Sequence, residues 1–185
     1  MILILDCTGQ DLPLLKAEFV QPVASIIEAA GYETRVLPLG NQILPDNTRA
    51  VILTGTALRD NQFLKVGLPG PLVRWTGPVL GICAGMQLIA VTFGGSLFPY
   101  EKIGMTEITV MRDDPVFSGK DRFNAWELHQ SGVEIDGEFE VLARSASGVQ
   151  SIKHQNKPWY GVLFHPEVRN EWVLTNFLKT YADLD

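Results

Sequence analysis

The sequence has little cysteine and little histidine. Its 185 residues include only two cysteines, Cys7 and Cys83, too few for a disulfide framework to hold a chain of this size together. Its three histidines are scattered, and no Cys, His or Asp cluster has the spacing of a metal site. No apolar run approaches membrane-spanning length, and the start MILILDCTGQ lacks the basic leader of a signal peptide. We therefore expect a reduced, cytoplasmic protein without a metal.

Basic residues are also scarce. Fifteen Lys and Arg stand against twenty-one Asp and Glu, so the formal net charge is −6, and the basic residues form no run. This balance disfavours nucleic acid and anionic membranes as partners, because both are recognised through clustered positive charge. A small soluble substrate or a protein partner fits better.

The order of apolar runs predicts the fold class. Hydrophobic residues make up 46% and charged residues 19%, which is typical of a globular domain, and no linker or repeat divides residues 1–185. The first half predicts buried strands and helices in alternation, and the second half predicts closely spaced strands and a final amphipathic helix. The expected strands are 1–6, 32–39, 49–55, 77–83, 106–111, 123–130, 139–145, 149–154 and 159–165, and the expected helices are 14–31, 84–95 and 170–184. We expect a single α/β domain of flavodoxin-like, three-layer type: a central, mostly parallel sheet flanked by helices, with an added antiparallel ribbon.

Cys83 stands where a strand turns sharply into a helix. It lies in GICAGMQ, directly after the apolar run of residues 79–82 and between Gly81 and Gly85. A residue at such a turn is exposed at the carboxyl end of a strand, where ligands bind in open α/β sheets. The N-terminus of the following helix favours the reactive thiolate, and the N–H of Ala84 is placed to bind an oxyanion. The arrangement is similar to the nucleophile elbow of serine hydrolases, although a free cysteine is also often just a small buried hydrophobe.

His165 is the candidate base for this nucleophile. It stands at the end of the strand expected at 159–165 and two residues before Glu167, with Pro166 stiffening the backbone between them. Glu167 can accept a hydrogen bond from one ring nitrogen, which leaves the other nitrogen to face the thiol. His154 precedes the QNKP turn of an expected hairpin, so we expect it to be solvated.

The two motifs together resemble those of the class I (triad) glutamine amidotransferases. The nucleophile motif G-x-C-x-G-x-Q is matched by residues 81–87, and the base motif Y-G-V-x-F-H-P-E is matched by residues 160–167. The resemblance covers essentially the whole chain in length and motif order. It implies that Cys83 attacks the side-chain amide of glutamine, that His165 is the base, and that Glu167 orients His165. The implied products are glutamate, through a γ-glutamyl thioester, and ammonia, which passes to a synthetase. Gln87 would help to hold the substrate.

The loop after the third strand departs from the family pattern. The family motif S-G-G-P stands here as Thr54-Gly55-Thr56-Ala57. The resemblance implies that the backbone N–H groups of Gly55 and Thr56 complete an oxyanion hole with Ala84. Threonine tolerates positive φ poorly, should the loop require it. The loss of one oxyanion donor costs roughly 3 kcal/mol of transition-state stabilisation.

A further stretch resembles the GMP synthetase branch of this family. AWELHQSG is similar to the W-x-S-H strand end that lines the glutamine pocket there, with Leu128 in place of serine and His129 kept. The resemblance implies that Leu128 and His129 contact the substrate and that the chain is the glutaminase subunit of a two-chain GMP synthetase. Because this chain has no glycine-rich phosphate cradle, we expect no cofactor in it, and we expect ATP and Mg on the partner synthetase.

Other functions remain open on the sequence alone. One alternative is another class I amidotransferase or a thiol hydrolase of γ-glutamyl compounds. A second is a regulatory module that keeps the fold with a disabled site. The intact residues Cys83, His165 and Glu167 favour an enzyme, whereas the changes at Thr56 and Ala57 keep the regulatory module under consideration.

Overall fold

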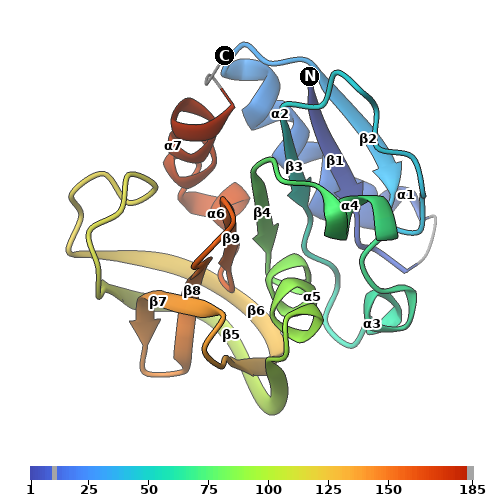
Figure 1. Cartoon of the computed structure of the whole chain (residues 1–185). Coiled ribbons are helices and arrows are strands. Elements are labelled where there is room, and N and C mark those ends of the chain that lie inside the picture. The colour runs from blue at the N-terminus through green and yellow to red at the C-terminus, as the bar shows by residue number, and fades with distance from the viewer. Residues whose placement is uncertain (10–11, 183–185) are drawn as a thin grey trace.

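A computed structural model describes residues 1–9 and 12–182 (Figure 1). In this part of the chain nine strands form one sheet in the order β2-β1-β3-β4-β9-β8-β7-β5-β6. The parallel strands are β1 (Ile2–Asp6), β2 (Thr34–Pro38), β3 (Ala50–Leu53), β4 (Val79–Ile82) and β9 (Trp159–Val162). The antiparallel ribbon is built from β5 (Ser96–Val110), β6 (Arg122–Glu134), β7 (Phe139–Ser145) and β8 (Gly148–His154). The predicted α/β class with an added ribbon is confirmed.

Helices cover both faces of the parallel part of the sheet (Figure 1). One face packs against α2 (Gln21–Ala29), α6 (Pro166–Arg169) and α7 (Trp172–Tyr181). The other face packs against α3 (Gln62–Val66), α4 (Gly70–Arg74) and α5 (Ala84–Thr92). Each face therefore has its own apolar core, and the strands between them are buried on both sides, as continuous apolar runs predict. The expected helix 170–184 is observed as α7, and residues 183–184 lie outside the described residues.

The expected helix 14–31 is three helical segments in succession. A short α1 (Pro13–Leu15) runs into a π-helical turn, η1 (Lys16–Val20), before α2 begins. Pro22 has no N–H to donate, so the α-helical hydrogen-bond pattern cannot continue through it, and the π turn lies directly before this break. The turn places Phe19 and Val20 in the core.

Strand β5 is longer than its expected range, 106–111. It begins at Ser96, and its pairing with β6 shifts register between Pro99 and Lys102. Pro99 and Gly104 lie inside the strand and hide it from a search for alternating apolar residues. The resulting β5–β6 hairpin curves away from the parallel sheet (Figure 1).

The structure corrects two sequence expectations near the chain's last strand. β9 ends at Val162 and not at His165, because the chain leaves the sheet and the His165 N–H donates to the Trp126 carbonyl of β6, at 2.8 Å. His154 is buried and not solvated. Its ring lies with its centroid 4.8 Å from that of Phe93 and 5.4 Å from that of Phe139.

A buried carboxylate ties the ribbon to the parallel sheet. Asp114, in the loop between β5 and β6, accepts hydrogen bonds from Lys153 Nζ at 3.0 Å and from the Tyr160 hydroxyl at 3.2 Å. Lys153 belongs to β8 and Tyr160 to β9. The loop is thereby fixed to both strands.

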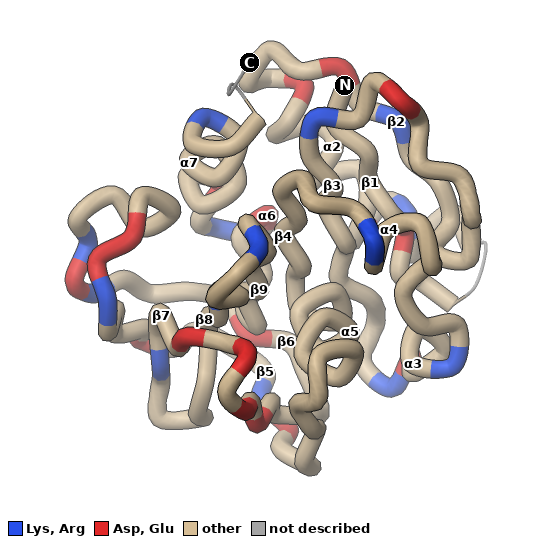
Figure 2. The backbone as a smooth tube through the Cα atoms, viewed as in Figure 1, with Lys and Arg blue, Asp and Glu red and all other residues tan. Residues whose placement is uncertain are grey.

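Positions of both charge signs are distributed along the fold (Figure 2). Among the described residues, no helix is long and apolar enough to cross a membrane.

Candidate active site

The parallel pairing of β4 with β9 brings the two sequence motifs together. Gly81 pairs with Gly161 and Ile82 with Val162, so the two strands end at the same edge of the sheet. Cys83 follows β4 directly, and its N–H donates to the Val162 carbonyl at 2.8 Å. His165 lies three residues beyond Val162. Two residues separated by eighty-odd positions thus become neighbours through a single strand pair.

The backbone at Cys83 forms a strained elbow. Cys83 has φ 47° and ψ −100°, a backbone conformation that residues other than glycine rarely adopt. Its neighbours are small for a steric reason. A Cβ at Gly81 would overlap the backbone of Gly85, and a Cβ at Gly85 would lie 2.6 Å from both the Cβ and the carbonyl oxygen of Leu53. The elbow turns β4 into α5, whose first residue is Ala84.

The His165 ring is held on three sides. Its Nδ1 lies 2.7 Å from Glu167 Oε1, its centroid lies 5.9 Å from that of Phe19, and a Cβ at Gly55 would lie only 2.6 Å from its Cε1. The ring is buried, at 1% exposure. Burial alone would lower the pKa of His165, but the Glu167 carboxylate and the Cys83 thiol outweigh it and raise the pKa well above 6.5. The environment therefore favours the protonated ring.

The thiol and the imidazole meet at one carbonyl oxygen. Cys83 Sγ lies 3.5 Å from the Leu128 carbonyl oxygen, and His165 Nε2 lies 3.4 Å from the same atom. The Cys83 side chain is also close enough to the ring to raise the pKa of His165. Cys83, His165 and Glu167 are thus brought together as the sequence predicts, with the β6 backbone as an unpredicted fourth contributor.

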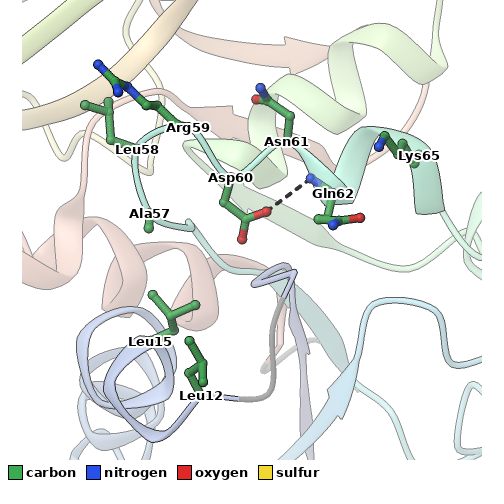
Figure 3. A pocket seen from close by; sticks show the side chains of 9 residues that line it. All are labelled: Leu12, Leu15, Ala57, Leu58, Arg59, Asp60, Asn61, Gln62 and Lys65. Carbon is green, nitrogen blue, oxygen red and sulfur yellow. Dashed lines mark hydrogen bonds between the residues drawn. The ribbon is translucent and has the colours of Figure 1, made fainter.

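The loop after β3 accommodates threonine without the backbone strain that the sequence suggested. Thr56 is not among the described non-glycine residues with positive φ; in this loop that conformation belongs to Arg59, with φ 69°. Thr56 Oγ1 donates to Asp60 Oδ2 at 2.7 Å, and the Gly9 N–H donates to the same oxygen at 2.7 Å. Asp60 also accepts the Gln62 N–H at 3.1 Å, as Figure 3 shows. Asp60, which no sequence motif marks, thus holds the loop closed through two local contacts and one contact, with Gly9, that is distant in sequence.

This loop separates two cavities. The inner cavity, at Cys83, has a volume of only about 20 Å³ and is lined by residues of the loop, of α5 and of β6. The outer cavity, of about 440 Å³, lies between the loop and the first helical segment (Figure 3). Both are lined by the same five loop residues, Ala57, Leu58, Arg59, Asp60 and Asn61.

The residues expected to contact a substrate all line the inner cavity, namely Gln87, Leu128 and His129. Gln87 Nε2 donates to the Ser131 carbonyl at 2.9 Å. Both ring nitrogens of His129 are already engaged, one with Glu127 and one with the Tyr100 carbonyl. Glu127 was not identified from the sequence. The alternation of WELHQ, which puts Glu127 and His129 on one face of β6, is the signal that points to it.

The backbone N–H groups expected in the oxyanion hole are unpaired. Within the described residues, those of Gly55, Thr56 and Ala84 donate no hydrogen bond to protein.

The other cysteine, Cys7, is buried behind the loop, where its N–H donates to Thr54 Oγ1 at 3.0 Å. Burial and the Asp6 carboxylate raise the pKa of the Cys7 thiol, so Cys7 is a poor nucleophile.

Comparison with known proteins places this geometry in context. The family model of glutamine amidotransferase class-I matches residues 16–180. The chain is 33% identical over 196 residues to a GMP synthase (glutamine-hydrolyzing) subunit of Pyrococcus abyssi, with all of both chains covered. The protein of the same name from Methanocaldococcus jannaschii is 32% identical, with 98% of this chain and 96% of that one covered.

Solved structures share the fold. A structure from Thermoplasma acidophilum, described as a GMP synthase subunit, superposes with a TM-score of 0.81 at 26% identity, covering 96% of this chain and 92% of that one. A glutamine amidotransferase from Thermotoga maritima has a TM-score of 0.71 at 18% identity, covering 99% and 83%, which shows a common fold alone.

Gly55→Ala is expected to displace the His165 ring, because the added methyl would lie 2.6 Å from Cε1. The rate at which iodoacetamide alkylates Cys83 should fall by about 10- to 100-fold, the loss expected when reacting groups are misplaced by roughly 1 Å. Gly137→Ala is the matched control, because nothing lies within 4 Å of a Cβ there. Equal alkylation rates in wild type and Gly55→Ala would contradict the contact.

Glu167→Gln is expected to lower the pKa of His165, because it removes the carboxylate that raises it. A raised pKa stabilises the fold below about 6.5 and loses that contribution as pH rises through the folded-state pKa, so stability should depend less on pH above 6.5 in the variant. NMR titration of the His165 ring measures the shift directly. His154, whose pKa is lowered by burial, is the internal reference and should not move.

Proposed function

This chain belongs to the class-I glutamine amidotransferase family, and we propose that it is the glutamine-hydrolysing subunit of a two-chain GMP synthase, with Cys83, His165 and Glu167 as its catalytic triad. The observation that carries the proposal is the shared contact of the Cys83 thiol and the Glu167-bound His165 ring at one carbonyl oxygen. Full-length likeness to chains named as GMP synthase subunits supports the choice within the family.

The proposed chemistry is acyl transfer through a thioester. The Cys83 thiolate attacks the side-chain amide carbon of glutamine, and the resulting oxyanion is held by the N–H groups of Gly55, Thr56 and Ala84. The His165 imidazolium gives its proton to the leaving nitrogen, so ammonia departs and a γ-glutamyl thioester remains. His165 then takes a proton from water, which attacks the thioester and releases glutamate and the thiolate. The raised pKa of His165 supports this cycle because it favours a protonated ring beside the sulfur.

The change at Thr56 is compatible with an oxyanion hole. A backbone N–H does not depend on the identity of its side chain, and Thr56 avoids positive φ. Its hydroxyl instead fastens the loop to Asp60. Threonine in place of the family's second glycine therefore changes how firmly the loop is held, and it does not change the number of oxyanion donors.

The closed loop supports dependence on a partner. A cavity of about 20 Å³ has room for one water molecule and not for glutamine. Substrate entry thus requires residues 57–61 to move, which would open the inner cavity towards the outer one. We infer that docking of the synthetase chain releases this loop, so that glutamine is hydrolysed only where ammonia is used.

The remaining parts of the reaction are assigned to the partner. ATP and Mg would bind to the synthetase chain, which accepts the ammonia, and the present chain would need no cofactor. The match to the full length of relatives that are themselves named as subunits supports a separate synthetase chain. From this proposed biosynthetic role we predict that the protein acts in the cytoplasm.

Glutamate release from glutamine, measured with and without the synthetase chain, tests the function. We expect turnover with the partner that falls about 1,000-fold or more in Cys83→Ala, because a triad nucleophile cannot be replaced. Cys7→Ala is the matched control, since the Cys7 thiol is buried and its pKa is raised, and it should keep the wild-type rate. Undiminished turnover in Cys83→Ala would refute the triad. An absence of turnover under every condition would favour a non-catalytic module.

Asp60→Ala should raise the rate of glutamine hydrolysis by the chain alone. The variant removes the acceptor that Thr56, Gly9 and Gln62 share. Loss of about 1.5 kcal/mol of closed-loop stabilisation corresponds to a rise of about tenfold. Lys65→Ala, which alters the outer cavity without touching these bonds, is the control. A partner-free rate that does not rise in Asp60→Ala means that this residue does not hold the loop shut.

A further inference from the structure

The outer edge of β6 holds the catalytic segments in place. Among the described strands, β6 is the last of the sheet and pairs only with β5, so the carbonyls on its other edge are free of partners from those strands. The Trp126 carbonyl accepts the His165 N–H at 2.8 Å, and the Leu128 carbonyl lies 3.5 Å from Cys83 Sγ and 3.4 Å from His165 Nε2. This one strand edge thus contacts the base segment twice and the nucleophile once.

The two residues on either side of Leu128 form a buried ionisable pair. Glu127 and His129 point to the same face of the strand and are 0% and 3% exposed. His129 Nε2 lies 2.7 Å from Glu127 Oε2. The other ring nitrogen, Nδ1, lies 3.2 Å from the Tyr100 carbonyl. A carboxylate and a carbonyl both accept hydrogen bonds, so the His129 ring has no nitrogen left for a substrate.

Further hydrogen bonds fix this pair to the rest of the ribbon. The Ser147 hydroxyl donates to Glu127 at 2.9 Å, and Gln150 Nε2 donates to it at 2.9 Å. Tyr100 lies where the β5–β6 register shifts, which frees its carbonyl for His129. Burial alone would raise the pKa of Glu127, but hydrogen bonds from His129 and Ser147 outweigh it and lower the pKa. The pair is thereby connected to its own β5–β6 hairpin and to the neighbouring β7–β8 hairpin, and the carboxylate stays charged.

We propose that Glu127 and His129 are positioning residues that hold the Leu128 peptide so that its carbonyl oxygen stays between the Cys83 thiol and the His165 ring. The proposal rests on the catalytic roles proposed for Cys83 and His165. Anchors on both sides of residue 128 leave its peptide little freedom to rotate. The function at residue 128 then belongs to the backbone, so leucine can stand there without loss.

The carbonyl holds the thiol and the ring next to each other. A carbonyl oxygen only accepts, so it can take a hydrogen bond from the Cys83 thiol and from a protonated His165 Nε2 at the same time. Distances of 3.4 and 3.5 Å are at the long end of the hydrogen-bond range. A displacement of a few tenths of an ångström is therefore enough to lose the contact, which is why firm anchoring of the peptide matters.

Glu127→Gln tests the proposal, because it keeps the shape of the side chain and removes its charge. We expect iodoacetamide to alkylate Cys83 about tenfold more slowly, and we expect the pKa of His165, followed by NMR, to fall. The charged groups facing that ring, Glu167 on α6 and Cys83 after β4, are unchanged in this variant. A purely structural role for Glu127 would lower the melting temperature without moving the His165 titration.

Asp114→Asn is the matched control. It alters a buried carboxylate of the same ribbon that bonds Lys153 and Tyr160 but not Cys83, His165 or the β6 edge, so stability should fall while the alkylation rate and the His165 titration stay as in wild type. If Glu127→Gln does not fold, Ser147→Ala removes one donor to the carboxylate and should produce smaller changes in the same direction.

Two failures are distinguishable. If wild type, in the presence of its synthetase chain, shows neither alkylation at Cys83 nor glutamine turnover, the proposed function is wrong and the positioning role falls with it. If wild type shows both, but Glu127→Gln or Ser147→Ala keeps the wild-type alkylation rate and His165 titration, the positioning role alone is overturned.

Discussion

The site depends on one strand pair, the parallel association of β4 with β9. This pairing places Cys83 and His165 at the same sheet edge, because β4 ends at Ile82 and its partner β9 ends at Val162. Beyond β9 the chain leaves the sheet, and the His165 N–H donates a hydrogen bond to a β6 carbonyl. The base is therefore held by this backbone bond as well as by Glu167. A register slip between these strands would separate the thiol from the ring even if every catalytic residue were present.

Steric constraints around the elbow explain the residues of the nucleophile motif. Cys83 occupies a conformation that costs on the order of 1–3 kcal/mol for a residue other than glycine. Gly81 and Gly85 have no room for a Cβ, and Gly55 leaves space for the His165 ring. Strain and close packing thus position the thiol, whereas charge from Glu167 sets the protonation of the base. The loop held by Asp60 has a separate effect, because it limits the access of substrate to Cys83 and does not change the catalytic groups themselves.

The sequence was most informative where local pattern and motif coincide. Apolar runs before Cys83 and before His165 identified two strand ends. The pattern grouped residues 159–165 with the closely spaced strands of the antiparallel ribbon, so the parallel pairing of β9 with β4, which brings the two ends to one edge, is known only from the structure. Burial of His154 was missed because its aromatic neighbours come from other elements. The first half of β5 was hidden by Pro99 and Gly104. Contacts that join distant segments, such as that of Asp60 with Gly9, leave no periodic signal, so only coordinates reveal them. The alternation in β6 places Glu127 on the face of His129, but it does not show the bonds of Glu127 to Ser147 and Gln150.

The most direct test of the central claim is to identify which cysteine reacts with a glutamine-analogue electrophile. The protein, together with its synthetase chain, is treated with 6-diazo-5-oxo-L-norleucine and digested, and the modified peptide is identified by mass spectrometry. A thiol that shares a carbonyl contact with a protonated His165 predicts a single adduct on Cys83 and protection by glutamine. An adduct on Cys7, or a protein that stays unmodified beside its partner, would contradict the account.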